Sequence, residues 1–324
     1  MIIEISIDDL SDRYSNTLHA YETEKDITKL PLYDKIKQYR SSKRLDWKSA
    51  SDKDIYNNVS DFIKLYKKIK KNGYTDNPYI KITVEKNGAW KLHGGYHRVS
   101  ILKYLKCKTV NANITMDPEF KKFYGYVSSM YKAYRAYEYI NHLVFSNYNF
   151  VRGNNRSELI KDHIDIDAPT ILDIGSYFGE IALSLSSIPG SKVVGIDTNK
   201  GHVNATNYIT LFPHYKDRKV SFYQGDIVDY NPSQFDVIVM LSVDRWVMKS
   251  HGRSGLKAVI KKIESKCKRY FFFESRGKHE ELALKLIHRY TNFTNQTLCG
   301  VDNGETNRRI WRFEIKEIIH VGEK

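Results

Sequence analysis

The stretch Ile171–Glu180, which reads ILDIGSYFGE, decides the fold of the second half of this chain. An apolar run ends in an acid and a glycine, and a second glycine precedes a helical pattern. Glycine lets the backbone turn tightly and lets a ligand approach main-chain groups closely. We therefore expect a strand, a ligand-binding turn and a helix, with the ligand beyond the carboxyl end of the strand.

Strand-like and helix-like segments alternate around this stretch, which predicts an α/β fold with a mostly parallel sheet covered on both faces. The expected strands are Thr170–Ile174, Lys192–Ile196, Val220–Tyr223, Phe235–Leu241 and Arg269–Glu274. The expected helices are Glu180–Ser187, His202–Leu211, Ser254–Glu264 and Lys278–Tyr290. A polar turn at Asn303-Gly304 precedes the alternating run Arg308–Ile315, so we also expect a closing antiparallel hairpin.

Two further acids follow the next two expected strands. Asp197 follows Ile196, where a carboxylate accepts hydrogen bonds from both ribose hydroxyls of an adenosine. Asp226 follows the third strand, where it accepts from an adenine amino group while Ile227 packs on the ring. Each acid alone is also typical of a helix cap or a turn. Together with Asp173, they predict a nucleoside-binding site at successive strand ends.

This set resembles class I S-adenosylmethionine-dependent methyltransferases over roughly residues 165–300. The resemblance implies a Rossmann-like sheet with S-adenosylmethionine as cofactor. It implies ribose binding by Asp197, adenine binding by Asp226, and a methionine-side loop that includes Gly175. Asp173 is expected either to support that loop or to face the amine. The full set of implied cofactor residues is Asp173, Gly175, Tyr177, Gly179, Asp197, Asp226, Ile227 and Leu241. The Gly-x-Gly-x-x-Gly spacing of nicotinamide enzymes is absent.

The fourth expected strand leads into the sequence Met240–Trp246, MLSVDRW, which in this family faces the transferred methyl group. Asp244 and His251 are candidate bases for a hydroxyl acceptor, and Arg245, with Arg253, is a candidate for holding an anionic acceptor. Taken singly, each is more often an ordinary loop residue. The Asn/Asp-Pro-Pro-aromatic sequence of methyltransferases that modify amines of DNA bases is absent, which counts against DNA as a partner.

The stretch from Leu241 to Leu256 is similar to RNA methylphosphate capping enzymes, which points toward a phosphate, hydroxyl or RNA-end acceptor. We expect methylation of a hydroxyl or phosphate on a small-molecule or glycan acceptor. RNA methylation is one alternative, and a nucleotide-switched binding protein is another.

The first half predicts a small α+β module. Strands at Tyr79–Val84 and Ala89–His93 form a hairpin, a Gly-Gly turn opens a helix, and Thr109–Ile114 is a further strand. The expected anion cradle consists of Gly94, Gly95, His97 and Arg98, although a turn and helix cap explain the glycines equally. Residues 55–116 resemble the ParB/sulfiredoxin-like superfamily, which implies binding of ATP or CTP phosphates. Tyr96 replaces the reactive cysteine of sulfiredoxins, and no helix-turn-helix follows.

The 324 residues predict a phosphate- or nucleotide-binding domain at 1–118, a helical connector at 119–164 and a methyltransferase domain at 165–324. With 52 Lys and Arg against 38 Asp and Glu, the net charge of +14 suits an anionic partner. The lysines of 64–71 lie on a predicted amphipathic helix and form either a solvated face or an anion-binding surface. The tyrosines of 119–145 are expected to pack against the domains or to stack bases.

The three cysteines show no metal-ligand spacing, so we expect neither a metal nor a disulfide framework. No apolar run approaches the ~18 residues of a membrane span, and the first residues lack the pattern of a signal peptide. These features predict a protein of the reducing cytoplasm.

Overall fold

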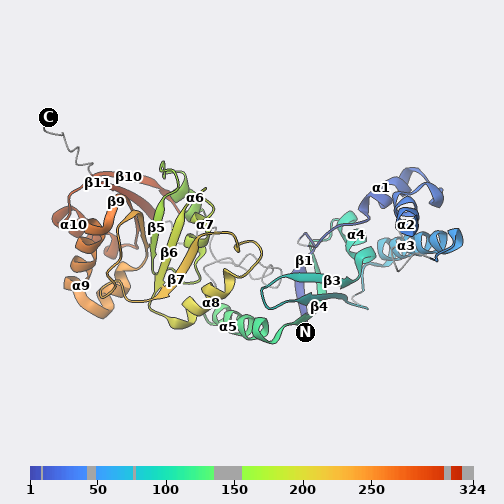
Figure 1. Cartoon of the computed structure of the whole chain (residues 1–324), viewed down its shortest axis with the longest axis horizontal. Helices are drawn as coiled ribbons and strands as arrows, with labels where there is room; N and C mark the ends of the chain where they lie inside the picture. Colours follow the sequence, from blue (N-terminus) through green and yellow to red (C-terminus); the bar gives the residue numbers. More distant parts are fainter. Residues whose placement is uncertain (9, 42–48, 76–77, 135–154, 303–307, 316–324) are drawn as a thin grey trace. The chain divides into compact units, whose positions relative to one another are not determined.

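The computed structural model describes residues 1–8, 10–41, 49–75, 78–134, 155–302 and 308–315. The chain divides into two compact units, the first comprising Met1–Lys121 and the second beginning at Lys122 (Figure 1). The expected turn at Asn303-Gly304 and most of the tyrosine-rich segment beyond 134 lie outside the described residues.

The first unit is built on a four-stranded sheet with the order β1-β4-β2-β3. Its strands are β1 (Ile2–Ser6), β2 (Ile80–Val84), β3 (Trp90–Gly94) and β4 (Thr109–Met116). Its helices are α1 (Ser15–Thr23), η1 (Ile27–Lys29, a 3-10 turn), α2 (Pro31–Ser41), α3 (Asp52–Asn72) and α4 (Tyr96–Tyr104). β2 and β3 pair antiparallel, so the predicted hairpin is present, and β4 lies parallel to β2.

α3 is the amphipathic helix that the sequence predicts. A capping box between Ser51 and Asp54 begins it, because each side chain bonds to the other residue's backbone N–H. The predicted apolar stripe is buried and consists of Val59, Phe62, Ile63, Tyr66 and Ile69. The expected solvated face is exposed and consists of Lys64, Lys67, Lys68 and Lys71.

The second unit contains a seven-stranded sheet with the order β10-β11-β9-β8-β5-β6-β7. Its strands are β5 (Thr170–Ile174), β6 (Lys192–Asp197), β7 (Val220–Gln224), β8 (Phe235–Leu241), β9 (Cys267–Glu274), β10 (Phe293–Val301) and β11 (Arg309–Ile315). Its helices are α5 (Pro118–Tyr134, which begins in the first unit), α6 (Arg156–Lys161), α7 (Glu180–Leu185), α8 (Lys200–Ile209), α9 (Asp244–Lys266) and α10 (Lys278–Tyr290).

The pairing confirms the predicted mostly parallel sheet. Strands β5 to β9 run parallel to one another, and β11 lies antiparallel between β9 and β10. The large core packs α9 and α10 against one face through Leu256, Ile260 and Leu286, which contact strand residues such as Phe271 and Phe273. α7 and α8 cover the other face (Figure 1).

The strand order reverses next to β5, and this reversal positions the site. The chain passes from β5 to β6 and β7 on one side, then returns to place β8 on the other side of β5. In α/β sheets, loops that leave the strands in opposite directions at such a point open a crevice for ligands at the carboxyl ends of the strands.

α9 differs from the prediction, because it starts at Asp244 rather than Ser254. Gly252, with φ 65° and ψ −169°, breaks it into two segments. In the first segment, residues 244–251, only Val247 and Met248 bring apolar side chains to the core, and the buried position before them is the acid Asp244. So short an apolar pattern does not predict a helix from sequence.

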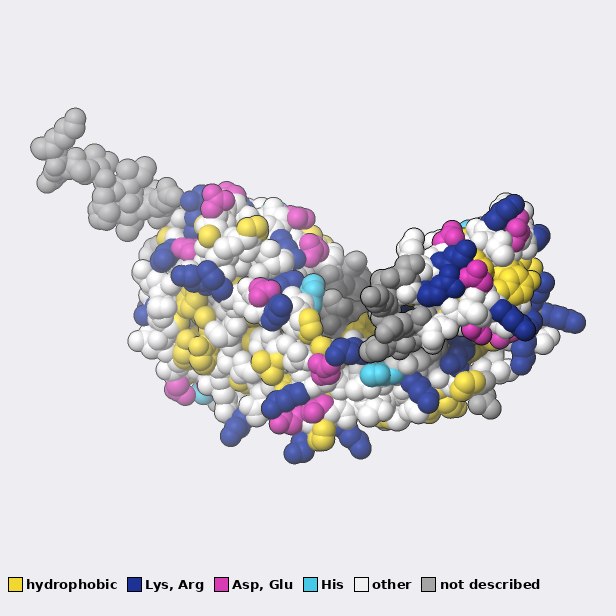
Figure 2. Space-filling view, turned by 45° about the vertical axis from the view of Figure 1, so that its right-hand side comes forward, with side chains coloured by type: hydrophobic (Ala, Val, Ile, Leu, Met, Phe, Trp, Pro, Cys, Tyr) yellow, Lys and Arg dark blue, Asp and Glu magenta, His cyan; other side chains and the backbone are white. Residues whose placement is uncertain are grey.

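The surface carries charges of both signs. On the face shown in Figure 2, Lys and Arg side chains lie among Asp and Glu side chains on each unit. Among the helices of the described residues, none has the length and apolar character required to cross a membrane.

Candidate functional site

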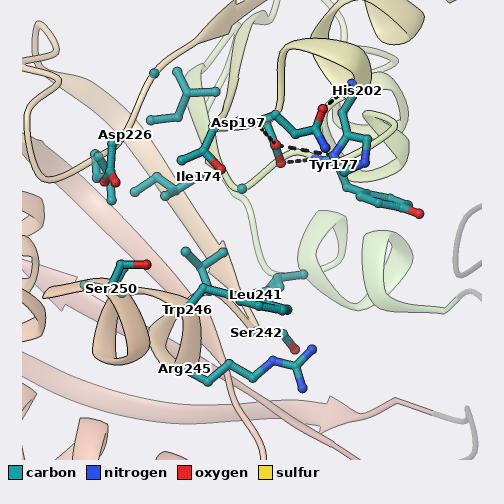
Figure 3. Close-up of a pocket in the computed structure, with 18 of the residues that line it drawn as sticks. Ile174, Tyr177, Asp197, His202, Asp226, Leu241, Ser242, Arg245, Trp246 and Ser250 are labelled. Atoms are coloured by element: carbon teal, nitrogen blue, oxygen red, sulfur yellow. Dashed lines mark hydrogen bonds and ion pairs between the residues drawn. The ribbon is translucent and has the colours of Figure 1, made fainter. Parts of the chain in front are cut away.

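A pocket of about 520 Å³ lies at the carboxyl ends of β5, β6 and β8 (Figure 3). This volume falls within the range of roughly 300–1,000 Å³ that is typical of small-molecule sites. Residues predicted from the sequence to bind the cofactor line it: Gly175, Tyr177, Asp197, Asp226, Ile227 and Leu241. These residues come from four separate segments of the chain. The parallel arrangement of the strands brings the segments together at one edge of the sheet.

The loop after β5 depends on glycine. Gly175 has a φ of 73°, and a Cβ added there would lie 2.3 Å from Cγ2 of Val243. Gly179, with a φ of 77°, caps α7, and a Cβ there would lie 2.4 Å from Cγ2 of Thr206. Tyr177 between them also has a positive φ, 48°. Gly175 and Tyr177 line the pocket, whereas Gly179 shapes the loop from outside it.

Asp197 ties the loops after β5 and β6 together. Its Oδ2 accepts a hydrogen bond from the Tyr177 N–H at 3.0 Å, and its Oδ1 accepts one from the Asn199 N–H at 2.8 Å. Nδ1 of His202 lies 3.4 Å from the same Oδ1. The Asp197 side chain keeps 11% of its surface exposed in the pocket wall. A carboxylate has about four lone-pair sites, so it retains acceptor capacity for ligand hydroxyls.

Asp226 and His251, to which the sequence assigns separate roles, contact each other. Nε2 of His251 lies 2.9 Å from Oδ2 of Asp226, and the Val228 N–H donates to Oδ1 at 2.9 Å. Burial alone raises the pKa of Asp226, but these hydrogen bonds and the nearby His251 and Lys262 lower it overall. The carboxylate is therefore held ionised at the pocket wall.

Lys262 orders the segment that follows Asp226. Its Nζ donates to the carbonyls of Ile227 at 2.9 Å, Val228 at 2.5 Å and Tyr230 at 2.9 Å. One ammonium thus satisfies three backbone acceptors and fixes the position of Ile227.

Asp244 is a correction to the sequence prediction. It was expected as a base, but it is fully buried and does not line the pocket. The Ser275 hydroxyl donates to its Oδ2 at 2.6 Å, and burial raises its pKa. A side chain so enclosed cannot reach an acceptor. His251 and Arg245, from the same segment, do line the pocket.

Asp173 is also enclosed. Burial raises its pKa to about 7, although a hydrogen bond from the Ala182 backbone and the charge of Arg156 oppose the shift. It does not line the pocket, so of its two expected roles the structure favours support of the loop over contact with an amine.

A buried ion cluster at the pocket was missed by sequence reasoning. Glu274 lies 2.9 Å from Arg308 and 3.5 Å from Arg156, which also lies 3.7 Å from Glu180. The Ser242 hydroxyl donates to Glu274 at 2.7 Å and accepts from Arg308. Both arginines and Ser242 line the pocket.

The cluster residues lie far apart in the sequence and follow no helical or strand period. No sequence pattern therefore predicts that they meet. The backbone of Ser242 has a φ of 59°, a strained conformation for a residue other than glycine, and such strain concentrates at functional sites. The other pocket residues missed include Met130 and Ser250, whereas Val243 and Trp246 belong to the stretch Met240–Trp246 that the sequence places at the methyl group.

The first unit contains its own pocket, of about 670 Å³, at the start of α4. Gly95, His97 and Arg98 line it as predicted, Gly94 does not, and α3 contributes Lys68. Arg98 donates to the carbonyl of Pro78.

His97 contributes an aromatic wall to this second pocket rather than a charge. Its ring centroid lies 5.3 Å from that of Tyr14 and 4.9 Å from that of Phe62. Burial, with the charge of Arg98, lowers the pKa of His97 and favours its neutral form.

Among the described residues, no three His, Cys, Asp or Glu side chains gather as metal ligands would. The tyrosine-rich segment packs where it is described. Phe123 stacks on Tyr208 at 4.8 Å, and Tyr126 makes an edge contact with Phe178 at 6.4 Å.

Comparisons with models of known protein families and with curated proteins found no match. Among solved structures, the bifunctional kinase-methyltransferase WbdD is similar over 59% of this chain, with 21% identity and a TM-score of 0.49. That similarity spans 45% of the WbdD chain, less than half its length.

Two other solved structures are similar over part of this chain. A TehB-like SAM-dependent methyltransferase from Corynebacterium glutamicum aligns with 62% of this chain and 100% of its own, with 15% identity and a TM-score of 0.40. Magnesium protoporphyrin IX methyltransferase from Synechocystis aligns with 49% and 76%, with 15% identity and a TM-score of 0.39. The likeness is partial, so the conclusions below rest on the residues of the two pockets.

Proposed function

We propose that the second unit is an S-adenosylmethionine-dependent methyltransferase that acts on a hydroxyl or phosphate oxygen of a small-molecule or glycan acceptor. One observation carries the proposal. Six of the eight residues predicted to bind the cofactor line one pocket at the point where the strand order reverses.

The pocket walls fit the parts of this cofactor. Asp197 offers carboxylate oxygens to ribose hydroxyls, and the apolar side chains of Ile227 and Ile174 flank a space for adenine. Asp226, ionised beside His251, accepts from the adenine amino group. Arg156 also lines the pocket, where it can donate hydrogen bonds to the carboxylate of the methionine part while it stays paired with Glu274 and Glu180. When bound, the cofactor supplies an electrophilic methyl group.

The protein's own contribution is alignment and charge. Residues 241–243 at the end of β8 form the wall next to Arg245, so an acceptor held there approaches the cofactor pocket directly. His251 pairs with Asp226 at the proposed adenine end, and Asp244 is enclosed, so neither candidate base is assigned to the transfer step. A phosphate acceptor, already ionised at neutral pH, needs no base.

Transfer of a labelled methyl group tests this function. The full chain and S-adenosylmethionine labelled in the methyl group are incubated with separate pools of phosphosugars and glycans, total RNA and DNA. We expect label in the phosphosugar or glycan pool, its loss in Asp197→Ala, and its retention in Asp217→Ala, an exposed acid remote from the pocket. Label mainly in RNA favours the RNA methyltransferase, and label in no pool favours a binding protein.

We further propose that the pocket of the first unit binds a phosphate-bearing ligand of the ATP or CTP kind. The supporting observation is that Arg98 and Lys68, from different helices, line the same pocket as the Gly95 turn. Backbone N–H groups at the start of a helix favour anions.

Titration with ATP and with CTP tests this second site. We expect Arg98→Ala to weaken binding at least tenfold, as for loss of a charge-assisted hydrogen bond. Lys71→Ala is the matched control, because Lys71 is an exposed α3 lysine outside the pocket. S-adenosylmethionine affinity should stay unchanged in both variants. Equal affinity of the native protein and Arg98→Ala for both nucleotides would refute the assignment.

A further inference from the structure

The first segment of α9, residues 244–251, forms one wall of the methyltransferase pocket and points to the class of acceptor. Resting on the proposed function, we propose that this wall recognises a phosphorylated sugar: the ring packs on Trp246, and the phosphate pairs with Arg245 and Lys249.

Trp246 is unusually accessible for a residue of its size. It is 55% exposed, the largest exposed fraction among the exposed large hydrophobic side chains of the described residues, and it lines the pocket. Burying an indole is stabilising, and this indole is left exposed to water. Its position in a pocket wall therefore indicates that a bound ligand covers it. The apolar C–H face of a sugar ring matches an indole face in size and character.

Two cations lie over this indole as cation–π contacts. Cζ of Arg245 lies 5.2 Å from the Trp246 ring centroid, and Nζ of Lys249 lies 5.4 Å from it. Within the part of the chain that the structure describes, neither cation lies within ion-pair distance of a carboxylate. The only acid on the segment, Asp244, is enclosed and bonded to Ser275. The positive charge beside Trp246 is therefore available to an anion.

Arg245 and Trp246 line the pocket at the proposed methyl-transfer region, and Lys249 is exposed beside them on the same helical segment. Figure 3 shows Arg245, Trp246 and Ser242 across the pocket from Asp197, the proposed ribose ligand. The segment directly continues the end of β8, and the break at Gly252 ends it after His251. An acceptor bound to this wall would thus lie opposite the cofactor's ribose side rather than on a remote surface.

The extent of the wall favours a single phosphate. A nucleic acid that binds through its backbone contacts several phosphates and needs a correspondingly long basic surface. Here two cations lie four positions apart, on neighbouring turns of one short helical segment. A guanidinium pairs with phosphate through two parallel hydrogen bonds, and Lys249 adds a second charge.

Calorimetry with hexose phosphates tests the proposal. The full chain is saturated with S-adenosylhomocysteine, which binds without transferring a methyl group, and is titrated with hexose 1-phosphates and 6-phosphates, free hexoses, inorganic phosphate, AMP and a short RNA. We expect at least one hexose phosphate to bind more tightly than the matching free hexose, inorganic phosphate, AMP and the RNA.

The variants separate the two contacts. Arg245→Gln and Trp246→Ala should each weaken hexose phosphate binding about tenfold or more, and Trp246→Phe should restore most of the ring contact. Lys257→Gln is the control, because Lys257 lies over Tyr290 at 4.0 Å and outside the pocket. S-adenosylhomocysteine affinity should be unchanged throughout, which separates failure of this proposal from failure of the proposed function. Tighter binding of AMP or RNA, binding insensitive to both variants, or no binding of any hexose phosphate would overturn it.

Discussion

The two pockets of this chain were both predicted from sequence, but they support those predictions to different degrees. In the second unit, residues from four separate segments meet in one pocket. In the first unit, the predicted residues 94–98 are contiguous and would lie together in almost any fold. Convergence of distant segments is therefore the stronger observation.

α3 adds a positive charge, Lys68, to the pocket of the first unit. Lys68 belongs to the lysine run that the sequence left open between a solvated face and an anion-binding surface. All four lysines considered are exposed, yet only Lys68 among them lines the pocket. A single run can thus serve as solvated surface and also contribute one residue to a pocket wall.

The largest expected effect compares Gly175, in the pocket of the second unit, with Gly94, which adjoins the pocket of the first unit without lining it. Gly175→Ala places a Cβ against Val243 at a φ of 73°, whereas a Cβ at Gly94 meets nothing within 4 Å. We expect Gly175→Ala to lower the free energy of unfolding by about 1–3 kcal/mol from backbone strain, with overpacking adding to it, and to weaken S-adenosylmethionine binding sharply. Gly94→Ala should change neither. Urea denaturation and calorimetry measure both, and equal behaviour of the two variants would contradict the account of the loop.

The next effect concerns the pH dependence of stability through Asp173. Its pKa is raised to about 7 when folded, so the folded state retains a proton that the unfolded state loses near the ordinary Asp pKa of 3.8. This group therefore lowers stability as pH rises from about 4 to about 7, by up to about 1.4 kcal/mol per pH unit, and has no further effect above pH 7.

Asp173→Asn removes this titration while keeping an oxygen to accept from Ala182. The free energy of unfolding of the variant, relative to the native protein, should rise between pH 5 and pH 7. Asp217→Asn, at an exposed acid, is the control. Parallel pH profiles for the native protein and Asp173→Asn would contradict a buried, protonated Asp173.

The smallest effect concerns the support of Ile227. Lys262→Met removes three hydrogen bonds to the segment after Asp226, so S-adenosylmethionine affinity should fall several-fold, about 1 kcal/mol. Lys261→Met, at an exposed neighbour whose Nζ lies 5.8 Å from the Tyr290 ring, should leave affinity unchanged. Titration of both variants decides this, and identical affinities would show that the segment holds its position without Lys262.

Sequence patterns predicted what depends on local periodicity. The bounds of β5 and β8 agree with the expected ranges, because each is a short apolar run with clear ends. The acids at the strand ends could also be predicted. In a parallel sheet the carboxyl ends of neighbouring strands lie at the same edge, so a residue that ends a strand is placed at that edge. The helical segment 244–251 was missed because only Val247 and Met248 bring apolar side chains to the core, which is too short a pattern to predict a helix.

Contacts between segments could not be predicted. Asp244 and His251 were equivalent candidates by sequence, but the helix that carries both turns one into the core and the other into the pocket. Arg156 and Arg308 lie more than a hundred positions apart, and only the folded sheet brings both to Glu274. Pairing of Asp226 with His251 likewise depends on the return of α9 over the sheet.

The central claim is that Asp197 holds the ribose of S-adenosylmethionine, and calorimetry tests it most directly. The native protein, Asp197→Ala and the control Asp217→Ala are titrated with S-adenosylmethionine. Loss of charge-assisted hydrogen bonds should cost Asp197→Ala about 1.5–3 kcal/mol, or roughly ten- to a hundredfold in affinity, while the control binds normally. Equal affinity of all three proteins, or no binding by the native protein, would contradict the account.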